Sequence, residues 1–172
     1  MRLPGLLPGF AIALLATAAQ AHITFENKEV VPGSTVKLVL RVPHGCDGSP
    51  TTRVRIQLPE VLRAAKPQPK AGWELAVVRP DASLHAASTG HAHGASSDVR
   101  EVSWSGRLDD AYYDEFVVRV TVDANAPAGP LHVPIVQECE TGVERWIEVP
   151  AAGKSSDDLA SPAPSIRITP RT

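Results

Sequence analysis

Apolar and polar residues alternate with a period of two along much of the chain. The clearest case is the segment 52–58, in which Val54, Ile56 and Leu58 alternate with two arginines and a glutamine. This alternation, in a run rich in β-branched residues, predicts half-buried β-strands. Further strands of this kind are expected over residues 35–42, 72–78, 99–104, 115–122, 131–136, 145–149 and 165–169.

Turn signals such as Pro32-Gly33, Asp47-Gly48 and Thr141-Gly142 separate these runs. The chain also contains 16 prolines, which disfavour long helices. No segment keeps an apolar period of 3.6 residues over about 12 residues. Seven to eight short strands in about 150 residues predict an all-β fold, a single antiparallel β-sandwich of the immunoglobulin-like type.

Two segments lack the alternating pattern. Residues 81–97 are rich in Ala, Ser, Gly and His, and we expect a long, exposed hairpin insertion there. Residues 151–164 are small, polar and proline-rich, which is typical of a linker to the last strand.

The first 21 residues have the three parts of a secretory signal peptide. Arg2 provides the positive charge, residues 10–18 form an apolar stretch, and Ala-Gln-Ala at 19–21 is a small-x-small cleavage site. The apolar stretch is too short for a membrane anchor, which needs about 20 residues. We therefore expect export and a mature domain, residues 22–172, that starts with His22 and has no membrane anchor.

Charge and motifs narrow the function classes. The 172 residues carry a formal net charge of −2 and no polybasic run, which disfavours binding to nucleic acid or to an anionic membrane surface. The sequence contains no phosphate-binding loop, nucleophile elbow or HExxH motif. The cysteines and histidines are then the residues that could carry chemistry.

The chain has two cysteines, Cys46 and Cys139. In an exported protein, two thiols predict one disulfide. The alternative, a pair of thiolate metal ligands, requires a reducing compartment.

His22 would have two nitrogen donors once the signal peptide is removed, its α-amine and its imidazole. The reference pKa values of such groups, about 7.7–8.0 and 6.5, allow both to lose a proton to a metal near neutral pH. Nitrogen ligands in a planar arrangement suit Cu(II), which also has the highest affinity among the common divalent metals. The alternative is a frayed chain end.

The loop 43–51 contains Cys46 and presents His44 and Asp47. Each of the latter also has a structural explanation, because Asp-Gly is a common turn dipeptide and a histidine can end a strand. His85, His91 and His93 belong to the insertion and are expected to be solvated. His132 is expected to be a satisfied strand histidine.

Acidic residues between 109 and 115 are expected to form a solvated turn rather than the paired carboxylates of a glycosidase.

Several separated motifs occur in a fixed order along the chain. They are Ala-His-Ile-Thr at 21–24, the segment 42–52 with His44-Gly45-Cys46-Asp47-Gly48, Lys-Pro-Gln-Pro-Lys-Ala-Gly-Trp at 66–73, Trp-Ser-Gly at 104–106, Tyr-Asp-Glu-Phe at 113–116, Gln-Glu-Cys-Glu at 137–140 and Arg-Trp-Ile-Glu at 145–148. Together they resemble the YcnI-like family, also called DUF1775, over residues 22–150.

The resemblance implies an exported immunoglobulin- or cupredoxin-like sandwich that handles copper. It implies a mono-histidine brace in which His22 chelates Cu(II) through amine and imidazole, an acidic side chain completes the coordination and a tryptophan lies against the site. Trp146 matches the tryptophan and Asp47 is the expected carboxylate. Glu26 and Glu29 are poorer candidates for the carboxylate. His44 is a further ligand, or it orients a ligand without contacting the metal.

Two functions follow as hypotheses. The first is a periplasmic Cu(II)-binding protein, a copper chaperone or buffer that serves a copper transporter or cuproprotein. The second is a redox enzyme like the histidine-brace copper mono-oxygenases, with His44 or His132 as the second histidine. Besides these two copper functions, a third hypothesis is a sandwich that binds a protein partner and no metal. Met1 is the sole methionine, so a methionine-rich Cu(I) site is excluded.

Overall fold

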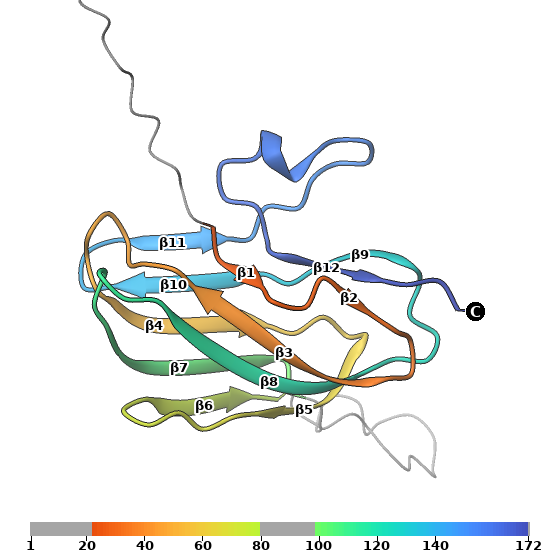
Figure 1. The fold of residues 1–172 in the computed structure, drawn as a ribbon, viewed down its shortest axis with the longest axis horizontal. Helices are drawn as coiled ribbons and strands as arrows, with labels where there is room; N and C mark the ends of the chain where they lie inside the picture. The colour runs from red at the N-terminus through yellow and green to blue at the C-terminus, as the bar shows by residue number, and fades with distance from the viewer. Residues whose placement is uncertain (1–21, 80–98, 172) are drawn as a thin grey trace, which may run out of the picture.

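The computed structural model describes residues 22–79 and 99–171 of the chain. Within these residues the chain forms twelve β-strands and one short 3-10 helix (Figure 1). The strands are β1 (Thr24–Phe25), β2 (Glu29–Val30), β3 (Thr35–Val42), β4 (Thr51–Gln57), β5 (Leu62–Pro67), β6 (Glu74–Val78), β7 (Glu101–Leu108), β8 (Asp114–Val122), β9 (Gly129–His132), β10 (Ile135–Cys139), β11 (Val143–Trp146) and β12 (Ser165–Ile168); the helix is η2 (Ser156–Asp158).

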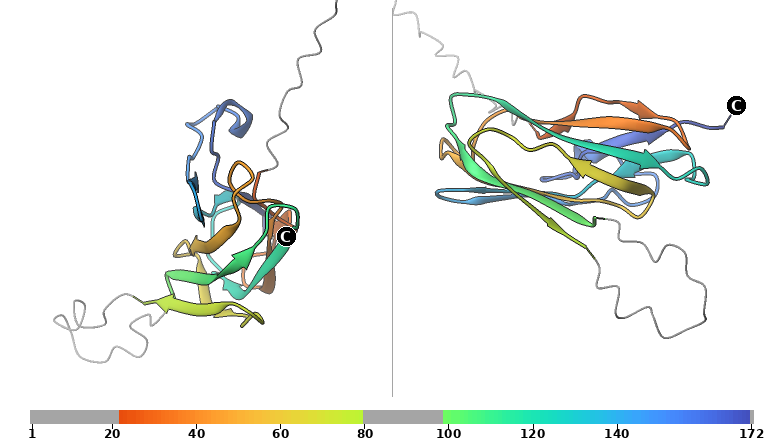
Figure 2. Two further views of the ribbon diagram at one scale, coloured as in Figure 1. Left: turned by 90° about the vertical axis from the view of Figure 1, so that its left-hand side faces the viewer. Right: turned by 90° about the horizontal axis from the view of Figure 1, so that it is seen from below.

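The strands form three sheets. One has four strands in the order β1-β3-β8-β5, and a second has five in the order β11-β10-β4-β7-β6. A third, of β2, β12 and β9, lies beside β1, and β1 contacts β12. The strand pairs are antiparallel except for β2 and β12, which pair in parallel. The two larger sheets lie as layers facing each other (Figure 2). The predicted all-β sandwich is confirmed.

The core lies between these layers and follows from the alternation in the sequence. Along β4, Val54 and Ile56 are buried while Arg53 and Arg55, which alternate with them, are half-buried on the opposite face. Trp104 of β7 and Phe116 of β8 meet inside, with ring centroids 5.4 Å apart. The Trp104 indole N–H donates to the Gln68 carbonyl (3.0 Å), so this buried polar group is satisfied.

The structure contains more strands than the seven to eight predicted. The additional ones are β1, β2 and β5. The first two contain only two residues each, too few to show a period. In β5 the pairing with β8 shifts between Arg63 and Lys66, and Ala64 has φ +48°, so this bulge interrupts the alternation.

The strand predicted over 131–136 is two strands in two different sheets. β9 ends at His132 and β10 begins at Ile135, with Pro134 in between. Proline has no backbone N–H to donate to a sheet, and here its carbonyl accepts from the Gln57 N–H instead (2.9 Å). The chain therefore changes sheets at this proline.

Residues 151–164 connect β11 to β12, as expected of a linker, and project from the edge of the sandwich (Figure 1). The end of this segment is packed. Ala163 is 3% exposed, and its N–H donates to the Glu148 carbonyl (2.8 Å). This segment therefore forms one wall of the region around His22 described below.

No helix of the described residues is long and apolar enough to cross a membrane. The predicted signal peptide and the predicted insertion at 81–97 lie outside the described residues.

Candidate metal centre

His22 is the first described residue and lies two positions before β1. Its imidazole packs against the indole of Trp146, at the end of β11, with ring centroids 5.1 Å apart and an interplanar angle of 52°. Trp146 is 4% exposed, whereas His22 is half-buried. The structure therefore brings together the predicted chelating residue and the predicted tryptophan, which are more than 120 positions apart in the sequence.

Trp146 is held in place by a buried polar network centred on Gln137 of β10. The Trp146 indole N–H donates to Gln137 Oε1 over a long 3.5 Å. Gln137 Nε2 donates to the His44 carbonyl and to Thr51 Oγ1, each at 2.7 Å. Because the amide nitrogen faces two oxygens and the amide oxygen faces an N–H, the orientation of this side chain is determined. Sequence reasoning missed Gln137 as a functional residue.

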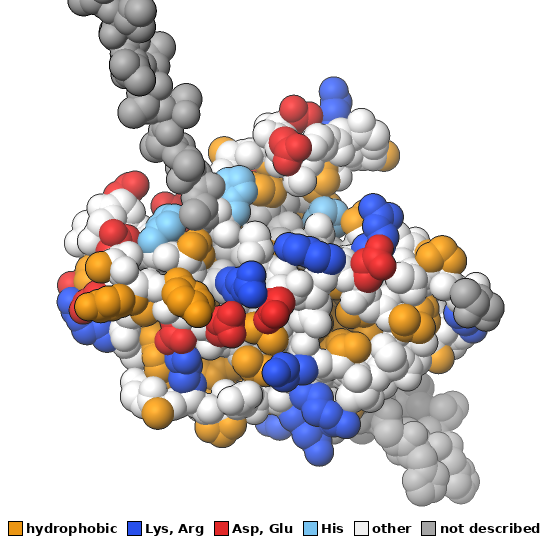
Figure 3. All heavy atoms as spheres, viewed as in Figure 1, with side chains coloured by type: hydrophobic (Ala, Val, Ile, Leu, Met, Phe, Trp, Pro, Cys, Tyr) orange, Lys and Arg blue, Asp and Glu red, His pale blue; other side chains and the backbone are white. Residues whose placement is uncertain are grey.

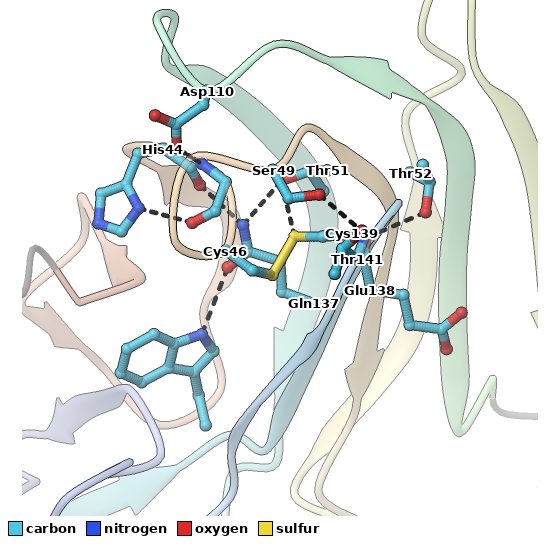
Figure 4. Close-up of a disulfide and its surroundings, with 12 residues drawn as sticks. His44, Cys46, Ser49, Thr51, Thr52, Asp110, Gln137, Glu138, Cys139 and Thr141 are labelled. Atoms are coloured by element: carbon cyan, nitrogen blue, oxygen red, sulfur yellow. Dashed lines mark hydrogen bonds between the residues drawn. A yellow bond between two sulfur atoms is a disulfide. The ribbon is translucent and has the colours of Figure 1, made fainter.

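His44 lies in the loop between β3 and β4, and its imidazole points away from the disulfide (Figure 4). Its Nδ1 lies 2.6 Å from the Gly45 carbonyl, so Nδ1 carries the proton. Nε2 makes no hydrogen bond within the described residues. A histidine whose Nδ1–H is bound to a backbone carbonyl presents Nε2 as a metal ligand.

The predicted disulfide Cys46–Cys139 is present, with Cα atoms 6.0 Å apart (Figure 4). It joins the 43–50 loop to the end of β10, two positions beyond Gln137. Further hydrogen bonds hold the loop, from the Gly45 N–H to Asp110 Oδ1 (2.9 Å) and from the Thr141 N–H to Ser49 Oγ (2.8 Å). The loop that carries His44 is thus fixed at both ends.

Asp47 lies at the exposed tip of this loop. It has φ +48° and is followed by Gly48 at φ +80°, so the two residues form the turn that the Asp-Gly dipeptide predicted. Its assignment as the carboxylate ligand stays a prediction.

A second carboxylate, Glu115, lies on the same surface as His22. Cross-strand register aligns Thr24 of β1 with Arg41 of β3, and Arg41 with Glu115 of β8. A hollow lined by His22, Arg41 and Glu115 follows this row. The Arg41 guanidinium lies 3.4 Å from Glu115 and 3.6 Å from Glu26, so one positive charge faces two carboxylates. The sequence signal for Glu115 was weak, because only strand register places it beside His22.

Among the described residues, no group of three or more His, Cys, Asp or Glu side chains lies close enough to hold a metal ion. A metal at His22 therefore needs a donor other than these side chains. The α-amine of a chain that begins at His22 would be such a donor, and the His22 imidazole is positioned to share a chelate ring with it. The donor set present, imidazole with a carboxylate nearby, fits Cu(II).

Two other histidine predictions have different outcomes. His85, His91 and His93 lie outside the described residues. We expected the imidazole nitrogens of His132 to have hydrogen-bond partners, and for one of them this was wrong. Its Nδ1 is buried with no hydrogen-bond partner in the described part of the chain.

Residues 22–168 match the family described as domain of unknown function DUF1775. The chain belongs to this family. It is the YcnI-like family that the sequence motifs indicated, and the match begins at the proposed mature N-terminus.

A solved structure supports this fold. A structure described as an uncharacterized protein from Nocardia farcinica with an immunoglobulin-like fold is similar over 87% of this DUF1775 chain and 99% of its own, with 23% identity and a TM-score of 0.64. A putative membrane anchored protein from Corynebacterium diphtheriae is similar over 87% of this chain and 34% of its own, at 11% identity and a TM-score of 0.41. No curated protein matches this DUF1775 chain.

The disulfide also bears on the compartment. Disulfides persist in oxidising environments and are rare in the reducing cytosol. The Cys46–Cys139 bridge therefore indicates an extracellular or periplasmic protein.

Proposed function

We propose that this protein is a periplasmic Cu(II)-binding protein, a copper chaperone or buffer, that holds the ion through the amine and imidazole of a processed His22. The observation that carries the proposal is the packing of the His22 imidazole on Trp146, whose position the Gln137 network maintains. The side chain of a histidine at a frayed chain end is not expected to pack against a buried, hydrogen-bonded tryptophan. The copper is cargo, passed to a copper transporter or cuproprotein.

The chain supplies further candidate donors around this pair. Glu115 lines a hollow together with His22, and His44 presents Nε2 from the fixed loop. Asp47 is the carboxylate that the resemblance implies. An exposed site of this kind, with one chelating residue and few further ligands, suits binding and release of an ion.

The test compares the chain that begins at His22 with the same chain acetylated at its α-amine, which removes that donor and leaves the imidazole in place. The processed chain is expected to bind one Cu(II), and its electron paramagnetic resonance spectrum should show nitrogen ligands. Loss of an outer-shell partner alone typically weakens metal binding about 10–100-fold. Acetylating the α-amine, or changing His22→Ala, should therefore weaken it by about 100-fold or more.

The matched control is His132→Ala, which removes an imidazole that does not line the hollow of His22 and Glu115. This variant is expected to bind copper like the wild type. Equal copper affinity of the processed chain and its acetylated form would refute the proposal, provided that circular dichroism shows both to be folded.

The second candidate function is a histidine-brace copper mono-oxygenase. The observation that favours it is the available Nε2 of His44, which offers a second imidazole. The test is formation of oxidised sugars from chitin or cellulose by the copper-loaded protein with a reductant. No product, with copper bound, argues for the first function.

A further inference from the structure

A second hollow begins at His22, on the other side from Glu115. It has a volume of about 380 Å³ and lies between β1, β2 and the projecting segment that precedes β12. We call it the anion hollow; the residues that define it here are His22, Phe25, Lys28, Ala163, Ser165 and Arg167. Figure 3 views this face, where histidine and Lys or Arg side chains lie beneath the projecting segment.

Two cationic side chains line the anion hollow. Lys28 and Arg167 are joined by a backbone hydrogen bond, from the Arg167 N–H to the Lys28 carbonyl (2.9 Å). Lys28 Nζ donates to the Phe25 carbonyl at 3.1 Å, which leaves its other protons available. The Arg167 guanidinium has no partner within the described residues.

No acidic side chain lines the anion hollow among the described residues. Three other hollows of the described surface each have a lining cation that is paired with a carboxylate: Arg41 with Glu115 at 3.4 Å, Lys70 with Asp114 at 2.6 Å and Arg55 with Glu138 at 3.0 Å. Glu29 is the register partner of Arg167 on β2, but neither Lys28 nor Arg167 makes an ion pair with a carboxylate among the described residues. Two such cations in one hollow attract an anion. The anion hollow is therefore complementary to a negatively charged ligand.

We propose that the anion hollow binds a small organic acid, whose carboxylate is held by Lys28 and Arg167. Apolar surface from Phe25, Ala163 and neighbouring prolines lines the same space, which suits a carbon skeleton better than inorganic phosphate. The serine hydroxyl of Ser165 offers a further hydrogen bond.

Because His22 lines the anion hollow, the bound acid is also placed to coordinate copper, a step that rests on the proposed function. A carboxylate oxygen of the acid then occupies one coordination position of the ion, beside the amine and imidazole of His22. The cargo of the protein is, on this inference, a Cu(II)–carboxylate complex rather than the bare ion.

The experiment uses succinate as the probe and the processed chain that begins at His22. Isothermal titration calorimetry measures succinate binding without copper, with inorganic phosphate as the comparison ligand. The double variant Lys28→Met/Arg167→Met is expected to weaken succinate binding at least about tenfold, because it removes two charge-assisted contacts. With copper bound, pulsed electron paramagnetic resonance should detect coupling from ¹³C-carboxylate succinate.

The matched control is Lys37→Met/Arg119→Met. These two exposed cations are cross-strand partners on β3 and β8 and lie outside the anion hollow. The control therefore removes the same two positive charges, a lysine and an arginine, without changing the hollow. It is expected to bind succinate within about twofold of wild type, as salt-screened distant charges contribute little.

Each outcome separates the two proposals. Equal succinate binding by the wild type and the Lys28/Arg167 variant, or no binding, overturns the anion hollow as a carboxylate site. Binding of phosphate but not succinate overturns the organic acid. Succinate binding without ¹³C coupling to bound Cu(II) overturns the shared coordination. If the processed chain binds succinate but not Cu(II), the anion site is supported. The proposed function and the copper–carboxylate cargo that rests on it are then both refuted.

Discussion

Gln137 connects three parts of the candidate centre through one buried side chain. It is 1% exposed and bonds to Trp146, to the His44 carbonyl and to Thr51. An amide is suited to this position because it offers two donors and an acceptor at once. The tryptophan beside His22 and the loop that carries His44 are therefore held by a common residue.

Gln137→Leu should lower the free energy of unfolding by about 2–4 kcal/mol. The reason is that the substitution leaves buried polar partners unsatisfied, each at a cost of about 1–3 kcal/mol. Urea unfolding followed by tryptophan fluorescence measures the change. The control, Gln57→Leu on the exposed end of β4, should shift stability by less than about 0.5 kcal/mol. Equal effects of the two substitutions would show that the network contributes nothing.

The identity of the carboxylate ligand is also decided at single residues. Glu115 shares a hollow with His22, while Asp47 lies exposed at the loop tip. We expect Glu115→Gln to weaken Cu(II) binding about tenfold, the equivalent of about 1.4 kcal/mol, and Asp47→Asn to change it less than about twofold. A competitive copper titration of both variants measures this. The opposite ranking would assign the ligand to Asp47.

At the scale of elements, β7 and the turn before β6 pack against each other without space for a side chain. A Cβ at Gly106 of β7 would lie 2.5 Å from Cδ2 of Trp73. Trp73 in turn packs edge-on against Phe116, with ring centroids 4.9 Å apart. The Trp-Ser-Gly motif thus has a packing function: its glycine makes room for an aromatic ring of the neighbouring segment.

Gly106→Ala should destabilise the fold by about 1–3 kcal/mol, the usual cost of overpacking. Thermal unfolding measures it. The same substitution in a Trp73→Leu background should cost less, because the smaller side chain can give way, and this double-mutant cycle isolates the contact. Identical costs in both backgrounds would place the strain elsewhere.

At the scale of the whole molecule, the disulfide joins segments 93 positions apart, at the end of the sandwich that holds His44. Its removal frees the unfolded chain, and bridges of this kind typically contribute about 2–4 kcal/mol. Reduction should therefore lower the urea midpoint of the native protein. The Cys46→Ala/Cys139→Ala variant should unfold at the lower midpoint with or without reductant. An unchanged midpoint on reduction would show that the loop is stable without the bridge.

The strand content of this protein was predictable because alternation is a local property that burial on one face imposes. Segments such as 35–42 and 115–122 show it in sequence and form β3 and β8 at nearly the same bounds. The three missed strands carry no such pattern. Pro134 interrupts a continuous apolar run, but which sheet follows it depends on the partners available to Ile135, and those are distant in sequence.

The sequence by itself determined the fold class, the family and the pairing of its two cysteines, because each depends on residue types, their order or their number. It also identified His22 and Trp146 through the resemblance. Only the tertiary structure decided what surrounds them. Four of the surrounding residues, on four different strands or strand ends, are Glu115, Gln137, Lys28 and Arg167. Strand register across the sheets brings them around His22 and Trp146, and no local pattern in the sequence encodes that register.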